Sequence, residues 1–121
     1  MSVSDGYIEY VKKLLQDFAP LRIKRMFGGP GVYSGNLFFA IVADDELYLK
    51  VDDLNRADYE AHRLLPFTFK MKSGRRGTMS YYPVPAEVQE DPDVLGNWVR
   101  KALDTARRGK RGAPREVAKK P

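Results

Sequence analysis

Apolar residues recur at helical spacing near both ends of the chain. After Ser4, which is a suitable N-cap, they fall three or four residues apart until Pro20 ends the pattern: Ile8, Val11, Leu15 and Phe18. Asp91-Pro92-Asp93 predicts the start of a last helix, because aspartate accepts hydrogen bonds from exposed amides and proline fits the first helical position. The apolar face of this helix holds Val94, Leu95, Trp98, Val99, Ala102 and Leu103. The period is lost from Arg107, so we expect the helix to fray there.

The first half of the chain between these helices has the pattern of strands. Residues 21–26 predict a short strand that runs into the turn Gly28-Gly29-Pro30-Gly31. Residues 32–44 are rich in β-branched and aromatic residues and predict a well-buried strand, with a bend at Ser34-Gly35-Asn36. Residues 47–51 alternate apolar and polar side chains, which predicts a half-exposed strand and a hairpin with the strand before it.

The second half continues with a helix and two more strands. A weak helical pattern from Asn55 to Leu65 ends at Pro66. Residues 67–72 alternate in the manner of a strand, and residues 78–84 return as its partner after a turn that contains glycine.

The predicted order is therefore α-β-β-β-α-β-β-α, and the fold class is α+β. Short turns favour antiparallel pairing, so we expect one antiparallel five-stranded sheet with helices on one face. A chain of 121 residues is long enough for one compact core and too short for two. We expect a single domain at residues 1–106 and a disordered tail at residues 107–121.

Composition excludes several kinds of chemistry. The chain has no cysteine, which rules out disulfides, thiolate nucleophiles and cysteine-held metal clusters. It has no apolar run of the length that a membrane helix needs and no apolar leader at Met1 to Gly6, so we expect a cytoplasmic protein with no membrane contact. Its one histidine, His62, lies in a polar stretch and has no serine or zinc-binding motif to complete. We therefore expect no enzyme and no cofactor.

The net charge of +5 is concentrated in the tail. Seven cations and only Glu116 lie beyond Ala106, a net of +6, and removing them leaves −1 for the rest of the chain: Arg107, Arg108, Lys110, Arg111, Arg115, Lys119 and Lys120. The positive charge of the tail predicts weak, non-specific contact with nucleic acid. Its candidate binding residues are Arg107, Arg108, Lys110 and Arg111.

Three other groups of residues are weaker candidates. Gly28, Gly29 and Gly31, with Arg25 and Phe27, would hold an anion on consecutive amides, but the motif lies between strands and fits a tight connection better. The acids at positions 44–46, 52 and 53 lack the spacing of a calcium loop, so we expect no metal.

Tyrosines on the sheet form the last group. Tyr33, Tyr48 and one of Tyr81 and Tyr82 would stack on bases if they lay on an open face beside Lys50, Lys70 and Lys72. Tyr81 and Tyr82 must point to opposite faces, and Tyr82 is the candidate binding residue of the two. Packing in the core or across strands is the commoner use of such aromatics.

The segment from Arg25 to Tyr33, RMFGGPGVY, resembles the signature of the TfoX N-terminal domain, the module of the Sxy/TfoX regulators of bacterial competence genes. Further motifs follow in the family's order at residues 47–52, 66–69 and 79–85, and Trp98 matches the family's tryptophan in the closing helix. The resemblance spans Ser4 to Arg108 and implies a two-layer α/β sandwich. Pro30 and the Ser34-Gly35-Asn36 turn depart from the family pattern.

The resemblance implies a role in regulating genes for DNA uptake, alongside a cyclic-AMP-responsive activator. Full-length regulators carry a second, helical domain after this one, whereas here a basic tail follows. We expect a non-catalytic regulatory module that binds a transcription-related protein partner through the open sheet face or the glycine loop. Nucleic-acid binding by the tail and the sheet Tyr and Lys residues, and a small ligand or enzyme site at the glycine loop, stay as alternatives. A homodimer through an edge strand or the open face is also left open.

Overall fold

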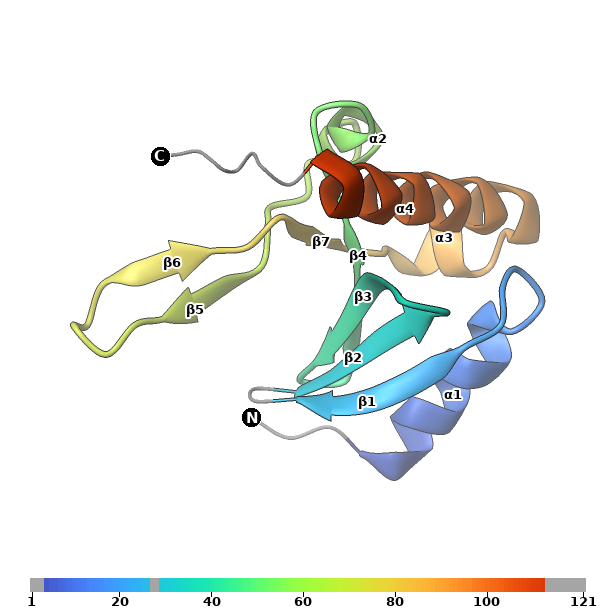
Figure 1. The fold of residues 1–121 in the computed structure, drawn as a ribbon, viewed down its shortest axis with the longest axis horizontal. Helices are drawn as coiled ribbons and strands as arrows, with labels where there is room; N and C mark the ends of the chain where they lie inside the picture. The colour runs from blue at the N-terminus through green and yellow to red at the C-terminus, as the bar shows by residue number, and fades with distance from the viewer. Residues whose placement is uncertain (1–3, 27–28, 113–121) are drawn as a thin grey trace.

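The computed structural model describes residues 4–26 and 29–112, with the backbone alone for residues 26, 29 and 110–112. A five-stranded antiparallel sheet has the order β1-β2-β3-β4-β7, and a separate two-stranded hairpin is formed by β5 and β6 (Figure 1). The strands are β1 (Arg22–Met26), β2 (Gly29–Ser34), β3 (Leu37–Ala43), β4 (Glu46–Lys50), β5 (Thr68–Lys70), β6 (Arg76–Thr78) and β7 (Tyr81–Pro83). The helices are α1 (Asp5–Leu15), α2 (Arg56–Glu60), α3 (Ala86–Gln89) and α4 (Pro92–Gly112). The predicted α+β class and five-stranded antiparallel sheet are confirmed.

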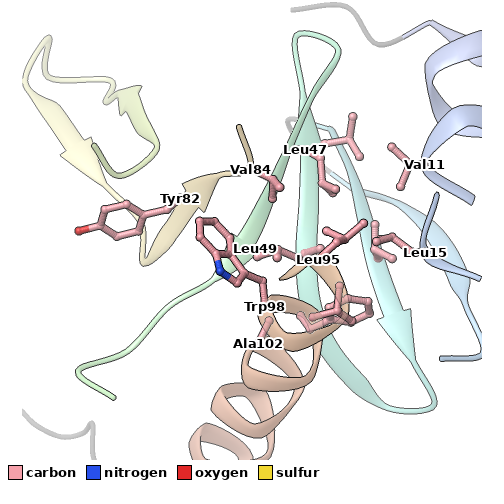
Figure 2. Packing of buried hydrophobic residues seen from close by; sticks show 14 of the residues in the cluster. Val11, Leu15, Leu47, Leu49, Tyr82, Val84, Leu95, Trp98 and Ala102 are labelled. Atoms are coloured by element: carbon pink, nitrogen blue, oxygen red, sulfur yellow. The ribbon is translucent and has the colours of Figure 1, made fainter. Parts of the chain in front are cut away.

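The helices pack on one face of the sheet, and together they form one continuous hydrophobic core. In Figure 2, Val11 and Leu15 of α1 and Leu95 and Trp98 of α4 converge on Leu47 and Leu49 of β4. The register places Leu47 opposite Val42 and Leu49 opposite Ala40, so all four side chains point to this face. Buried residues of the two short helices, Tyr59 and Val88, join the same cluster. We call this the core face of the sheet.

Two tight turns use left-handed backbone. Gly35, with φ of 60°, closes the turn between β2 and β3, so the segment expected as one bent strand forms two paired strands. Asp44 and Asp45, with φ of 52° and 55°, form the two-residue turn between β3 and β4, where both residues need positive φ and aspartate is among the residues that tolerate it. The carboxylate of Asp45 also accepts hydrogen bonds from the Ser4 amide (2.8 Å) and hydroxyl (3.1 Å). The hydroxyl of Ser4 in turn caps α1 by accepting from the Tyr7 amide, as predicted.

Several element boundaries differ from the predictions. The middle helix is only Arg56–Glu60, and the expected strand at residues 78–84 is divided between β6 in the hairpin and β7 in the main sheet. Helix α4 continues to Gly112 instead of fraying at Arg107. Val94, expected on its buried face, is exposed. No helix within the described part of the chain is both long and apolar enough to cross a membrane.

Candidate functional site

Opposite the core face lies a second sheet surface rich in aromatic and basic side chains. Strand geometry sends alternate residues to opposite faces, and the register groups these side chains on the face away from the helices. We call it the outer face and define it by Arg22, Lys24, Tyr33, Phe38, Ile41, Tyr48, Lys50 and Tyr81. The buried residues of all four helices belong to the core face, so no helix in the described part of the chain packs over this surface.

A β-bulge explains how Phe38 reaches the outer face. Val32 pairs with Ala40, but the next residue, Tyr33, pairs with Phe38, so Phe39 is the extra residue. Phe39 and Ala40 consequently both face the core, where each is fully buried. Phe38 is released to the other side, where its ring stacks on Tyr33 with the centroids 4.9 Å apart and the planes 17° apart.

The aromatic rings continue across the sheet and carry two cations. The ring of Phe38 is 5.8 Å from that of Tyr81, centroid to centroid. Lys50 places its Nζ 4.9 Å from the centroid of the Tyr81 ring, and Arg22 places its guanidinium carbon 4.7 Å from that of Tyr33. These are cation–π distances. The result is a row of rings from β2 to β7 with a cation at each end.

Burial within this cluster changes the proton affinity of its members. Burial, and then the neighbouring Tyr33, raise the pKa of Tyr81 above the usual tyrosine range. Burial lowers the pKa of Lys50, and Asp52 opposes that shift only in part. Tyr48, half-buried at the rim, has its pKa raised by burial and by Glu46, and its ring meets Phe67 edge-on at 5.1 Å. The phenols of Tyr81 and Tyr48 are thus neutral hydrogen-bonding groups at physiological pH.

The structure separates the two adjacent tyrosines as the strand period requires. Tyr82 lies on the core face, where it is 8% exposed and packs on Tyr59 at 5.4 Å between centroids. Its selection as the candidate on the open face is wrong, because its position opposite Leu49 in the register turns it inward. Tyr81 is the member of the pair on the outer face. Lys50 lies beside it, whereas Lys70 and Lys72 belong to the separate β5–β6 hairpin, Lys70 in β5 and Lys72 in its turn.

The glycine segment is strand over the residues that the structure describes. Gly29, Pro30 and Gly31 belong to β2 and pair with Met26, Arg25 and Lys24 of β1. The predicted turn is therefore shorter than Gly28 to Gly31, because three of its residues are held in an antiparallel ladder. Arg25 is exposed and its guanidinium lies 3.6 Å from the Asp5 carboxylate. Phe27 and Gly28 lie outside the described residues.

Two of the four candidate cations of the tail are engaged by the fold. Arg108 donates to both carboxylate oxygens of Asp52, at 2.8 and 2.9 Å, and so connects α4 to the end of β4. Arg107 contacts Asp104 one turn earlier, at 2.8 Å. Lys110 and Arg111 are in α4, but their side chains lie outside the described residues. Arg108 is half-buried and serves the domain, not a free tail.

The remaining titratable candidates have structural partners. His62 Nδ1 lies 3.3 Å from the Glu87 carboxylate, and its ring meets Trp98 edge-on. Among the described residues, no three acidic or histidine side chains come together in the way a metal site needs. Three of the five acids considered for a metal are otherwise occupied: Asp45 with Ser4, Asp52 with Arg108, and Asp53 with Arg56.

Sequence reasoning missed the bulge that builds the outer face. It predicted the pairing of the strands on either side of residues 73–77, but not that this hairpin is separate from the main sheet. A signal for the bulge was present, since two large aromatics followed by Ala-Ile-Val cannot alternate strictly between one buried and one polar face. The separation of the hairpin from the main sheet left no signal in the local patterns.

Comparison with models of protein families finds a match over most of the chain. The model of the TfoX N-terminal domain matches residues 13–106, which spans most of the chain from α1 to α4. No curated protein matches the chain significantly. Because the family match covers well over half of the sequence and includes the strands that build both faces of the sheet, the chain belongs to the TfoX N-terminal domain family.

Proposed function

We propose that this protein is a non-catalytic interaction module of the TfoX family that binds a protein partner through the outer face of its sheet. The observation that carries the proposal is the row of aromatic rings and cations on a sheet face over which none of the described helices packs. In family terms, the partner belongs to the cytoplasmic machinery that regulates competence genes.

The composition of the outer face fits a protein interface. Protein interfaces are enriched in Tyr, Phe and Arg relative to the rest of the surface, and their strongest contacts cluster around buried aromatic and Arg residues. Arg22, Tyr33 and Phe38 combine these types within one contact network. Because the rings are already packed on one another, a partner would order few side chains on binding, which reduces the entropic cost of association.

The test is direct measurement with an identified partner. A tagged full chain recovers proteins from native cytosol at low salt, mass spectrometry identifies them, and calorimetry measures the purified pair. We expect the double variant R22A/Y33A to weaken binding by at least about tenfold, as loss of central interface residues does. The double variant Y10A/K13A removes an exposed tyrosine and an exposed cation from α1 and is expected to bind normally. Equal binding by both variants, or no specific partner, contradicts the proposal.

A second candidate function is stacking of single-stranded nucleic acid on the same face. Aromatic side chains next to Lys or Arg form such platforms in RNA-binding sheets. The row of rings supports this, but Tyr81 is only 3% exposed, which leaves Tyr33 and Phe38 as the accessible rings. Fluorescence anisotropy with a labelled single-stranded 20-mer separates the two functions, because only this one predicts that Tyr33→Ala weakens oligonucleotide binding.

A further inference from the structure

The β5–β6 hairpin forms an arm that extends away from the body of the molecule (Figure 1). We define the arm as residues 68–78, which comprise the two paired strands and the turn that joins them. It contains four cations, Lys70, Lys72, Arg75 and Arg76, and no acidic residue. All four side chains are exposed, and none forms an ion pair with a carboxylate of the described residues.

The two sides of the arm are chemically different. Thr68 pairs with Thr78 and Lys70 with Arg76, so these four share one side. Phe69 pairs with Gly77 on the other side, where the ring lies so close to the backbone that a Cβ on Gly77 would be 2.7 Å from it. The ring covers a glycine and stiffens the ribbon, and one side of the arm is left wholly polar and basic.

The pairing of Lys70 with Arg76 opposes the stability of the arm. Like charges directly opposite one another on neighbouring strands repel, and no acid on the arm relieves them. Arg76 donates a hydrogen bond to the Thr68 hydroxyl at 2.8 Å, which positions its guanidinium on the polar side of the arm but does not neutralise its charge. An unneutralised local repulsion of this kind is typical of a functional site. The ligand that would relieve the repulsion is a polyanion.

The C-terminal end of α4 lies near the base of the arm. The Val51 amide donates to the Ser80 carbonyl at 2.9 Å, which brings the chain after β4 next to the chain that leaves the arm. Asp52, the next residue, holds Arg108 of α4. Helix α4 therefore ends on the same side of the molecule as the arm, as Figure 1 shows.

We propose that the arm is a phosphate-contacting β-ribbon that binds double-stranded DNA, with the end of α4 beside it. A two-stranded ribbon fits the major groove of B-DNA, which is about 12 Å wide, whereas the major groove of duplex RNA is too narrow for side chains to read. Cations on such a ribbon reach phosphates on either side of the groove and position the protein without selecting a sequence. This site is separate from the outer face and does not depend on the function proposed for it.

The experiment measures binding of the full chain to a labelled 25-base-pair duplex DNA of arbitrary sequence, by fluorescence anisotropy over a series of salt concentrations. The variant K70Q/K72Q/R75Q/R76Q neutralises the arm. The matched control K12Q/K13Q/R63Q/R100Q removes the same charge from exposed positions on α1, after α2 and on α4. We expect the arm variant to bind at least about tenfold more weakly at low salt, and its log–log salt dependence to be shallower by about 3 to 4, since each phosphate contact contributes about 0.9. The control should retain most of the affinity and the slope.

Three outcomes would overturn the proposal. Equal losses in the arm variant and the control would show that net charge alone binds the DNA. Binding to duplex RNA as tight as to duplex DNA would remove the groove argument. Absence of DNA binding by the full chain would leave an acidic protein surface as the ligand of the arm.

A stability measurement guards against an indirect effect. Neutralising Lys70 and Arg76 removes a repulsion, so the urea midpoint of the arm variant should equal or exceed that of the parent chain. A clearly lower midpoint would mean that these cations serve the fold, and it would overturn the proposal. The calorimetric test of the outer face uses different residues, so either site can fail without the other.

Discussion

At the scale of single residues, Gly35 and Gly6 allow a direct comparison of backbone conformation, because Gly35 has a positive φ and Gly6 lies in a regular helix. A Cβ added at either glycine meets no atom within 4 Å, so neither alanine substitution would clash with neighbouring residues. Only Gly35 has left-handed backbone, with φ of 60°. Any difference between alanine substitutions at the two sites must therefore come from backbone conformation.

We expect Gly35→Ala to lower the free energy of unfolding by about 1 kcal/mol, because a side chain disfavours the left-handed region. Gly6→Ala, inside α1, should raise it by up to about 1 kcal/mol, because alanine is the better helix former. Urea denaturation followed by tryptophan fluorescence measures both. Equal effects of the same sign would mean that the turn between β2 and β3 is not strained by a side chain.

At the scale of elements, the bulge in β3 assigns two neighbouring phenylalanines to opposite faces. Phe39 is fully buried in the core, and Phe38 is half-buried on the outer face. Phe39→Ala should cost about 3 to 5 kcal/mol of unfolding free energy, the usual loss when a buried phenylalanine is truncated.

Phe38→Ala provides the comparison, since it removes the same atoms one residue away. Its loss should be clearly smaller, about 1 to 2 kcal/mol, because only part of the ring is withdrawn from water. Denaturant unfolding of both variants under the same conditions gives the comparison. A loss at Phe38 as large as that at Phe39 would contradict the assignment of faces.

Local patterns predicted much of this element list, and the failures share one physical origin. The helical period around Val11 and the Ser4 cap, and the alternation at residues 47–51, depend on nearby residues and were confirmed. The division of residues 78–84 depends on which distant strand each half meets: β6 pairs with β5, and β7 pairs with β4. Pairing partners far apart in the sequence are set by packing, which a local pattern does not contain.

The sequence predicted the types of residue in the candidate site, but not which individual residues lie on the outer face. Tyr33, Tyr48 and Lys50 were grouped on the condition that they share an open face, and the register places them on one face of the sheet. Opposite directions for Tyr81 and Tyr82 followed from strand geometry, yet choosing which faces inward required the register with β4. The length of α4 was underestimated because the ion pair of Arg108 with Asp52, 56 residues away, holds a turn that apolar periodicity does not mark.

At the scale of the whole molecule, the buried tyrosines make stability depend on alkaline pH. Burial raises the pKa of Tyr59 and Tyr81 above the usual tyrosine range. Burial, and then the neighbouring Tyr10, raise the pKa of Tyr7 to about 12. The unfolded chain releases these protons near pH 10, while the folded chain keeps them, so stability is present below about pH 10 and is lost as pH rises above it. Lys50, whose pKa is lowered by burial, works in the opposite direction below its unfolded value.

We expect the urea midpoint to fall between about pH 9.5 and 11.5, as linkage to raised tyrosine pKa values requires. Tyr59→Phe should make this fall shallower. It should also keep or raise stability at neutral pH by up to about 1 kcal/mol, because the buried Tyr59 hydroxyl has no hydrogen-bond partner among the described residues. A midpoint that stays level to about pH 11.5 would contradict the assignment of buried phenols.

The backbone bridge at the base of the arm has a consequence for how members of such a family diverge. The Met79 amide donates to the Phe67 carbonyl at 3.0 Å, and the Phe67 amide donates to the Tyr81 carbonyl at 2.7 Å. The segments that enter and leave the arm are therefore hydrogen-bonded to each other at its base. The core contains no residue of the arm. We therefore expect insertions, deletions and charge changes within residues 68–78 to leave the five-stranded sheet and its helices intact. The length and charge of the arm can thus change, in evolution or by design, independently of the rest of the fold.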